Sequence, residues 1–131
     1  MDIFWISKQE ALSIHNKQLA LHGGPQGIRD EGLLESALAR PQNYAAYAGE
    51  SPSIYRLATA YAYGIAKNHA FVDGNKRTAM VVSFTFLGMN GLEVTASQQD
   101  AYFTFYDLAA GKLTEDELTA WFEKNSVPSS D

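Results

Sequence analysis

Residues 78–89 carry apolar side chains on almost every face of a helix. The apolar members are Ala79, Met80, Val81, Val82, Phe84, Phe86, Leu87 and Met89. A helix that is hydrophobic all round is stable only inside a domain, where other elements cover it. The rest of the chain must therefore surround this helix. Asn90-Gly91 is a suitable end for it, because such a pair can adopt the left-handed backbone region.

Two capping boxes predict where the first and last helices begin. Ser7 is followed by Glu10, and Thr114 is followed by Glu117. In each pair, the first side chain can accept a hydrogen bond from the helix start, and the glutamate can accept one in return. We expect a helix over 7–21 that is stopped by the glycine-rich turn 23–27, and a final helix that continues through Phe122.

Three further segments complete an all-α prediction. Ser53 can cap a helix whose apolar side chains recur every three or four residues as far as Ile65. We expect a short helix over 30–39 that is ended by Pro41, because the residue before a proline avoids the helical region. A loop with exposed Tyr44 and Tyr47 then follows over 42–52. A helix over 97–110 adds to a compact single-domain bundle of about six helices around a central buried helix.

Composition limits the functional class. The chain has 131 residues, a formal net charge of −5 and no cysteine. The absence of cysteine excludes disulfides and thiolate chemistry, and the acidic balance is opposite to that of a non-specific nucleic-acid binder. No apolar run approaches the roughly 20 residues of a membrane span. We expect a soluble cytoplasmic protein with no membrane partner, a domain over 1–126 and a flexible C-terminal tail over 127–131.

The segment 68–78 differs from the rest because it gathers chemically active side chains where a loop enters the apolar helix. A helix start has unpaired N–H groups and about half a positive charge, so it attracts anions. Gly74 can take positive φ, which lets the N–H groups of residues 74–76 converge. Lys76 and Arg77 lie at the helix end where cations are unfavourable, and a bound phosphate would relieve that repulsion.

Asp73 and His69 extend the same hypothesis. A carboxylate beside phosphate oxygens needs a cation, and Mg²⁺ is commonly held by one or two carboxylates together with substrate phosphates. His69 suits a general base that takes a proton from a hydroxyl group. Phe71, between them, is expected to anchor the loop in the core. Each residue also has a structural interpretation: Asp73 or Asn75 as a helix cap, Gly74 as a turn residue, His69 as a structural histidine, and the two cations as surface charges.

The run His69-Ala70-Phe71-Val72-Asp73-Gly74-Asn75-Lys76-Arg77 resembles the signature of the Fic/Doc family, His-x-Phe-x-[Asp/Glu]-[Gly/Ala]-Asn-[Gly/Lys]-Arg. Lysine after the asparagine is typical of the Doc (death-on-curing) branch. The resemblance also covers the turn 23–27, the segment 30–38 and the ending 111–117. Relative to the family's adenylyltransferases, Ala70 replaces a proline, Lys76 a glycine and Met80 an arginine.

The resemblance implies a helical Fic-type fold and the phosphotransferase toxin of a type II toxin–antitoxin pair, with ATP and Mg²⁺ as cofactors. It implies that His69 is catalytic, that Asp73 engages Mg²⁺ and that Phe71 is the buried anchor. Nucleotide-binding residues by the same argument are Gly74, Asn75, Lys76, Arg77 and Lys67. The family's target is a threonine of elongation factor Tu, whose modification stops translation.

The resemblance also implies partners. A Phd-like antitoxin would place a helix in a groove near the site, and nucleic acid would be reached only through that antitoxin. Tyr102, Phe103, Phe105 and Tyr106 are candidates for the groove, although helical spacing favours most of them as core. His15 and His22 are interpreted as structural or surface residues. Two alternative functions remain: protein adenylylation, and antitoxin binding by a catalytically silent chain.

Overall fold

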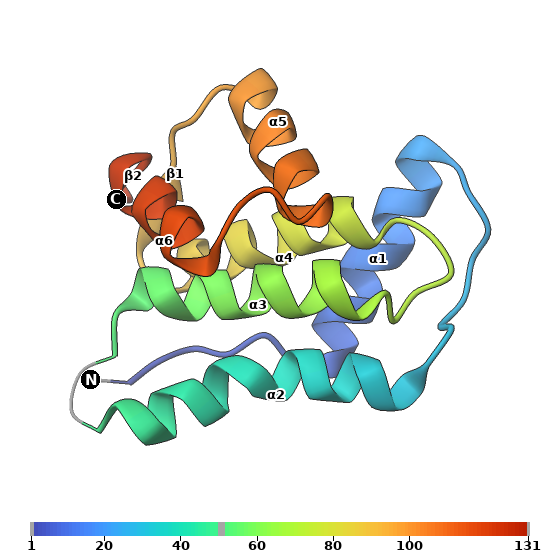
Figure 1. Ribbon diagram of the computed structural model, residues 1–131, viewed down its shortest axis with the longest axis horizontal. Helices are drawn as coiled ribbons and strands as arrows, with labels where there is room; N and C mark the ends of the chain where they lie inside the picture. The colour runs from blue at the N-terminus through green and yellow to red at the C-terminus, as the bar shows by residue number, and fades with distance from the viewer. Residues whose placement is uncertain (1, 50–51, 131) are drawn as a thin grey trace.

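The computed structural model describes residues 2–49 and 52–130, which form six helices and one two-stranded sheet. The elements in chain order are α1 (Lys8–His22), α2 (Glu31–Ala48), α3 (Ile54–Asn68), α4 (Asn75–Met89), β1 (Leu92–Val94), α5 (Gln98–Ala109), α6 (Glu115–Lys124) and β2 (Ser126–Pro128). Figure 1 shows α2, α3 and α4 side by side, with α1 across one end of α4. The all-α prediction is confirmed.

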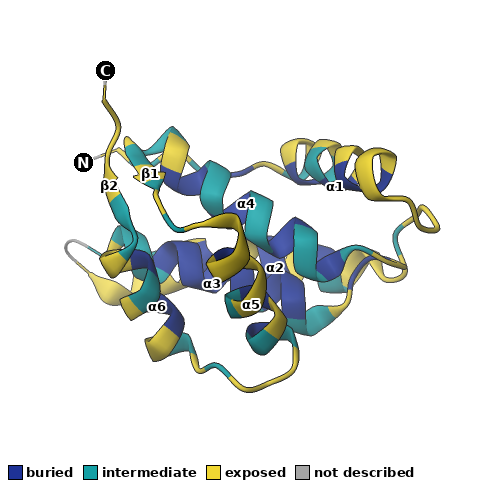
Figure 2. Ribbon diagram, turned by 90° about the horizontal axis from the view of Figure 1, so that it is seen from above, coloured by how far each residue is buried: buried dark blue, intermediate teal, exposed yellow. Residues whose placement is uncertain are grey.

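The centre of the bundle is shared by α3 and α4. α3 packs against α2, α4, α5 and α6, while α4 packs against α1, α3, α5 and β1. Figure 2 shows that these two helices carry much of the buried surface. At Gly64 of α3, an added Cβ would lie 3.2 Å from the Cα of Ala37 in α2, so glycine allows these two helices to approach closely. The apolar helix over 78–89 is central as predicted but not covered on every side: Ala79, Val82, Phe86 and Leu87 are buried, and Met80, Val81, Phe84 and Met89 are half-buried.

Side-chain caps begin five of the six described helices. Both predicted capping boxes are present, at Ser7 with Glu10 and at Thr114 with Glu117. Ser53 caps α3 as predicted, and Asp30 and Ser97 cap α2 and α5. Such caps satisfy N–H groups that have no partner inside the helix. α4 is the exception, and its uncapped start lies at the segment with the active side chains.

The predicted end of α2 at Pro41 is wrong, because the helix continues through the proline to Ala48. Proline removes one hydrogen bond and disfavours the helical region for the preceding residue, at a cost of about 3 kcal/mol. However, Leu34, Leu38, Pro41 and Ala45 follow helical spacing and pack against the core. Burial of that stripe outweighs the local penalty. The predicted loop over 42–52 is therefore helical as far as 48, and residues 50 and 51 lie outside the described residues.

Two predictions of side-chain exposure, one on α2 and one on α5, had opposite outcomes. Tyr44 and Tyr47 are exposed as expected, Tyr47 by 93%. On α5, Phe105 is buried, but Tyr102, Phe103 and Tyr106 are exposed, so the prediction that most of these aromatic residues belong to the core is wrong. α5 packs on one side only, mainly against α4, and no described element covers its other side.

The C-terminal segment and the N-terminal segment both bond to the turn that ends α4. β1 and β2 pair antiparallel, with Leu92 opposite Pro128, so ordered pairing continues two residues beyond the predicted domain boundary at 126. The Ser129 N–H donates to the Gly91 carbonyl at 2.9 Å. At the other terminus, the Phe4 N–H donates to Asn90 Oδ1 at 3.0 Å, and Asn90 Nδ2 donates to the Phe4 carbonyl at 2.9 Å. No described helix is long and apolar enough to cross a membrane.

Candidate active site at the start of helix α4

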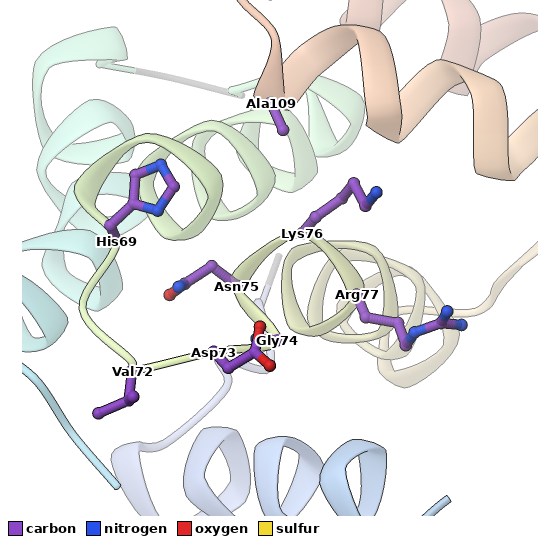
Figure 3. Close-up of a pocket in the computed structure, with 8 residues that line it drawn as sticks. All are labelled: His69, Val72, Asp73, Gly74, Asn75, Lys76, Arg77 and Ala109. Carbon is purple, nitrogen blue, oxygen red and sulfur yellow. The ribbon is translucent and has the colours of Figure 1, made fainter. Parts of the chain in front are cut away.

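The loop between α3 and α4 opens onto a cavity of about 380 Å³. Its lining residues are His69, Val72, Asp73, Gly74, Asn75, Lys76, Arg77 and Ala109. Figure 3 shows these side chains, with His69 on the loop and Lys76 on α4 extending toward α5. Six residues of the predicted site, from His69 to Arg77, therefore share one cavity.

The start of α4 has unpaired backbone donors. Gly74 is the N-cap, with φ of +79° and ψ of 15°, and no side chain among the described residues caps this helix. Positive φ favours glycine, which has no Cβ to clash with the backbone. The Gly74 N–H itself donates to Asp73 Oδ1 at 2.8 Å. The first-turn N–H groups of residues 75–77 have no side-chain cap, so they and the positive end of the helix are available to an anion.

The loop is fixed by a short extended contact with the segment before α2. Ile28 and Phe71 form an antiparallel bridge, and the Val72 N–H donates to the Gly27 carbonyl at 3.1 Å. Phe71 is 1% exposed, which places it in the core as predicted. Asn75 also contributes to the loop, because its amide donates to the Phe71 carbonyl at 2.9 Å and accepts from the Phe71 N–H at 3.0 Å. The buried Asn75 side chain therefore faces the loop backbone.

His69 is the one non-glycine residue with positive φ in the described chain, at 51°. Non-glycine residues in this region are strained, and such strain is common at active sites. The conformation ends α3, and Arg29 stabilises it by donating from Nε to the His69 carbonyl at 2.7 Å. The imidazole is exposed and lines the cavity (Figure 3). A free imidazole in this position can receive a proton from a group that enters the cavity.

Asp73 lines the same cavity without forming an ion pair in the described part of the chain. Its carboxylate accepts from the N–H of the next residue, Gly74, and Gly74 is the N-cap. The interpretation of Asp73 as the cap of α4 is therefore wrong. No group of three metal-binding side chains exists among the described residues. A single carboxylate cannot form a metal site by itself. It fits a Mg²⁺ ion whose other ligands are phosphate oxygens and water.

Lys76 and Arg77 carry full charges at the positive end of α4 and form no ion pair with a described carboxylate. The Lys76 ammonium lies 5.1 Å from the ring centroid of Tyr102 and 4.8 Å from that of Tyr106. Arg77 Nη1 lies 3.4 Å from His22 Nε2. Two cations beside an uncapped helix start make the cavity electropositive, which suits a phosphate chain.

Lys67, predicted from the resemblance as a further nucleotide-binding residue, is placed outside this lining. It belongs to the last turn of α3, and its ammonium lies 5.8 Å from the Tyr63 ring centroid. The same ammonium lies 3.3 Å from where a Cβ on Gly111 would be. Lys67 thus faces the turn between α5 and α6.

Three residues around the site have no site role in the sequence-based prediction. Arg29 holds the end of α3, Gly24 lies against Asp73, and His15 contacts the loop from α1. An added Cβ on Gly24 would be 2.6 Å from Asp73 Oδ2. All three lie more than 35 residues before the loop they contact. The sequence signal among them is the glycine-rich turn 23–27, which stops the first helix and belongs to the family resemblance but does not reveal a contact with Asp73.

Comparison with known proteins establishes the family of this chain. The model of the Fic/DOC family matches residues 5–87, and the chain belongs to that family. The chain is 45% identical over 74 residues to the protein named toxin Doc of Mycolicibacterium smegmatis, an alignment that covers 56% of this chain and 57% of that relative. It is 33% identical over 109 residues to the protein named protein kinase doc of Escherichia phage P1, which covers 83% of this chain and 82% of the relative.

Proposed function

We propose that this chain is the toxin of a toxin–antitoxin pair and transfers the γ-phosphoryl group of ATP to a protein hydroxyl. The observation that carries the proposal is one cavity lined by an uncapped helix start, an exposed imidazole, and two cations and a carboxylate that form no ion pair among the described residues. The names of the two relatives, a toxin and a protein kinase, support the same reaction class.

The triphosphate of ATP would occupy the electropositive side of the cavity. The N–H groups of the first turn of α4 can donate to phosphate oxygens, and Lys76 and Arg77 can add charge-assisted hydrogen bonds. Asn75 would act through its backbone N–H, because its side chain is bonded to Phe71. Asp73 would hold Mg²⁺ with the phosphates. When bound, the ion would neutralise part of the charge on the transferred group.

His69 would act as the general base. As the hydroxyl oxygen of the target forms a bond to the γ-phosphorus, the bond from that phosphorus to the bridging β–γ oxygen breaks. ADP leaves with the electron pair, and His69 takes the hydroxyl proton. General-base assistance of this kind contributes roughly 10²–10⁴-fold to the rate. We propose a threonine of elongation factor Tu as the acceptor, so that the reaction arrests translation.

Labelled ATP tests the reaction and separates it from adenylylation. Purified protein with Mg²⁺ should transfer label from γ-labelled ATP to elongation factor Tu, and H69A or D73A should reduce transfer by at least about 100-fold. K76A should also lose activity, whereas K124A, a matched change in the last turn of α6, should retain it. Label from the α-phosphate would instead establish AMP transfer. Transfer from neither position would contradict the proposal.

Growth arrest tests whether catalysis is needed in the cell. Expression of the wild-type chain should stop growth, and expression of H69A should not. Arrest by H69A at equal protein level would favour the catalytically silent alternative, in which the chain acts through binding.

The antitoxin would bind beside the active site. A groove of about 430 Å³ lies between α1, α4 and α5, and it is lined by Gln18, His22, Arg77, Met80, Phe84, Ala96, Gln98, Ala101 and Tyr102. Its apolar floor suits one face of an amphipathic helix, and Arg77 at its edge suits an acidic residue on that helix. A Phd-like antitoxin helix is therefore the proposed occupant. M80Q should weaken antitoxin binding, while Y47A, at a fully exposed position on α2, should not.

A further inference from the structure

His15 contacts the active-site loop at two points. It lies in α1, is 2% exposed, and its ring stacks on the ring of Phe71 with centroids 3.7 Å apart and an angle of 9°. Its Nε2 lies 2.8 Å from the Asp73 carbonyl oxygen. A carbonyl oxygen only accepts hydrogen bonds, so Nε2 must carry the proton and donate it.

This bond sets the orientation of the peptide between Asp73 and Gly74. The described chain has no cis peptide bond, and the C=O and N–H of a trans peptide point in opposite directions. A carbonyl held toward α1 therefore directs the Gly74 N–H away from α1. Asp73 Oδ1 accepts that N–H at 2.8 Å, so the direction of the peptide also fixes the carboxylate.

Without His15, little would fix this peptide. Gly74 adopts φ of +79°, and glycine populates negative φ about as readily. A rotation of the 73–74 peptide would break the bond between the Gly74 N–H and Oδ1 and release the carboxylate. It would also turn a carbonyl oxygen, rather than an N–H, toward the start of α4, where an anion is expected.

We infer that His15 is a positioning residue that orients the Asp73 carboxylate for Mg²⁺ through the 73–74 peptide. This inference rests on the proposed function, in which Asp73 holds the ion. The donor Nε2–H performs the role, and stacking on Phe71 provides the packing. The two contributions can be separated, because phenylalanine keeps an aromatic ring but has no donor. Glutamine has an amide nitrogen at the same number of bonds from Cβ as Nε2.

H15F and H15Q are therefore the informative variants. Binding of Mn²⁺, as a probe for Mg²⁺, is measured by water proton relaxation in the presence of a non-hydrolysable ATP analogue. We expect H15F to bind Mn²⁺ about tenfold more weakly and H15Q to remain within about threefold of wild type. In ¹H–¹⁵N spectra without metal, the Gly74 amide signal should move in H15F and stay near its wild-type position in H15Q. If H15F does not fold, H15M replaces it as the variant without a donor.

The outcomes distinguish this inference from the proposed function. Wild-type Mn²⁺ affinity and an unmoved Gly74 signal in H15F would overturn the role of His15. An equal loss of Mn²⁺ affinity in H15F and H15Q would also overturn it, because the hydrogen-bond donor of glutamine would then fail to restore Mn²⁺ binding. If the wild-type chain binds neither Mn²⁺ nor the ATP analogue, the proposed function fails. The Gly74 signal then still reports whether His15 orients the peptide.

Discussion

Asn75 and Phe71 exchange two hydrogen bonds, the Asn75 amide donating to the Phe71 carbonyl and accepting from the Phe71 N–H. The asparagine is 8% exposed, so this pairing is protected from water. Asn75 thus closes the loop between the two helices from inside. Its side chain supports the site by holding the loop in place, even though its motif position predicts contact with nucleotide.

N75A should therefore lower the free energy of unfolding by about 1–3 kcal/mol, because it leaves a buried N–H and a buried carbonyl of Phe71 without their partner. N75D keeps the acceptor but turns a carboxylate oxygen toward the Phe71 carbonyl oxygen in a buried site, so its loss should be at least as large. Urea unfolding followed by circular dichroism measures this loss. K17A, at an exposed position on α1, is the control and should change stability by less than about 0.5 kcal/mol. Equal stability of N75A and wild type would show that the pairing adds nothing.

Gly24 should be essential for the position of Asp73. A Cβ at residue 24 would lie 2.6 Å from Asp73 Oδ2, so G24A must displace the carboxylate or the turn. G23A is a matched control, because Gly23 also has positive φ but no atom lies within 4 Å of its added Cβ. Both variants should lose about 1 kcal/mol of stability from backbone strain. We expect G24A alone to raise the Mg²⁺ concentration needed for half-maximal label transfer, by about tenfold. Similar Mg²⁺ dependence in the two variants would contradict this role.

Tyr102 and Tyr106 should keep Lys76 away from Asp73. The ammonium lies near both rings, and each such contact contributes about 0.5–1 kcal/mol at an exposed site. Without the rings, the lysine would be drawn toward the carboxylate three residues before it and compete with Mg²⁺. The double variant Y102L/Y106L should therefore weaken Mn²⁺ binding about threefold to tenfold. Y102F/Y106F, which keeps both ring faces, should bind as wild type does. Weaker binding by both variants would point to the hydroxyl groups instead.

Stability at high pH should depend on Tyr61. Burial raises the pKa of Tyr61 to about 12, although its hydroxyl oxygen accepts from the Ile6 N–H at 2.9 Å, which lowers the pKa in part. The unfolded chain releases this proton near pH 10, whereas the folded chain keeps it. The contribution of protonated Tyr61 to the free energy of unfolding is therefore fully present below about pH 10. It is lost as the pH rises toward 12, by roughly 1.4 kcal/mol per pH unit.

Y61F tests this dependence by urea unfolding at pH 8, 10 and 11.5. At pH 8 the variant should be about 1 kcal/mol less stable, because the Ile6 N–H loses its acceptor. Between pH 10 and 11.5 its stability should fall less steeply than that of wild type. Parallel pH profiles for the two proteins would show that Tyr61 does not titrate differently on unfolding.

Most helix starts could be predicted from the sequence because capping is local. Ser7, Ser53 and Thr114 each bond within three residues, so the pattern and the structure record the same interaction. Pro41 shows the limit of local rules, because a buried stripe on both sides kept α2 helical through a residue that usually ends helices. The exposure of Tyr102 could not be predicted either, because spacing on α5 does not reveal that only one side of the helix is covered.

The candidate site also has a part that local sequence predicts and a part that depends on distant contacts. Residues 69–77 are contiguous, so one motif brought most of the cavity lining together before the fold was known. The groups that orient the motif are distant in sequence: His15 lies 58 residues from its partner Asp73, and Arg29 lies 40 residues from His69. Neither residue has a local pattern that indicates its contact. Their roles depend on how α1 and the segment before α2 pack against the loop.

The attachment of Phe4 and Ser129 to the Asn90-Gly91 turn has a practical consequence for experiments. Both contacts lie at the C-terminal end of α4, while the site lies at its N-terminal end. A helix of this length separates the two by about 22 Å. A fluorophore or affinity handle attached at Phe4 or Ser129 would thus stand well clear of the cavity mouth.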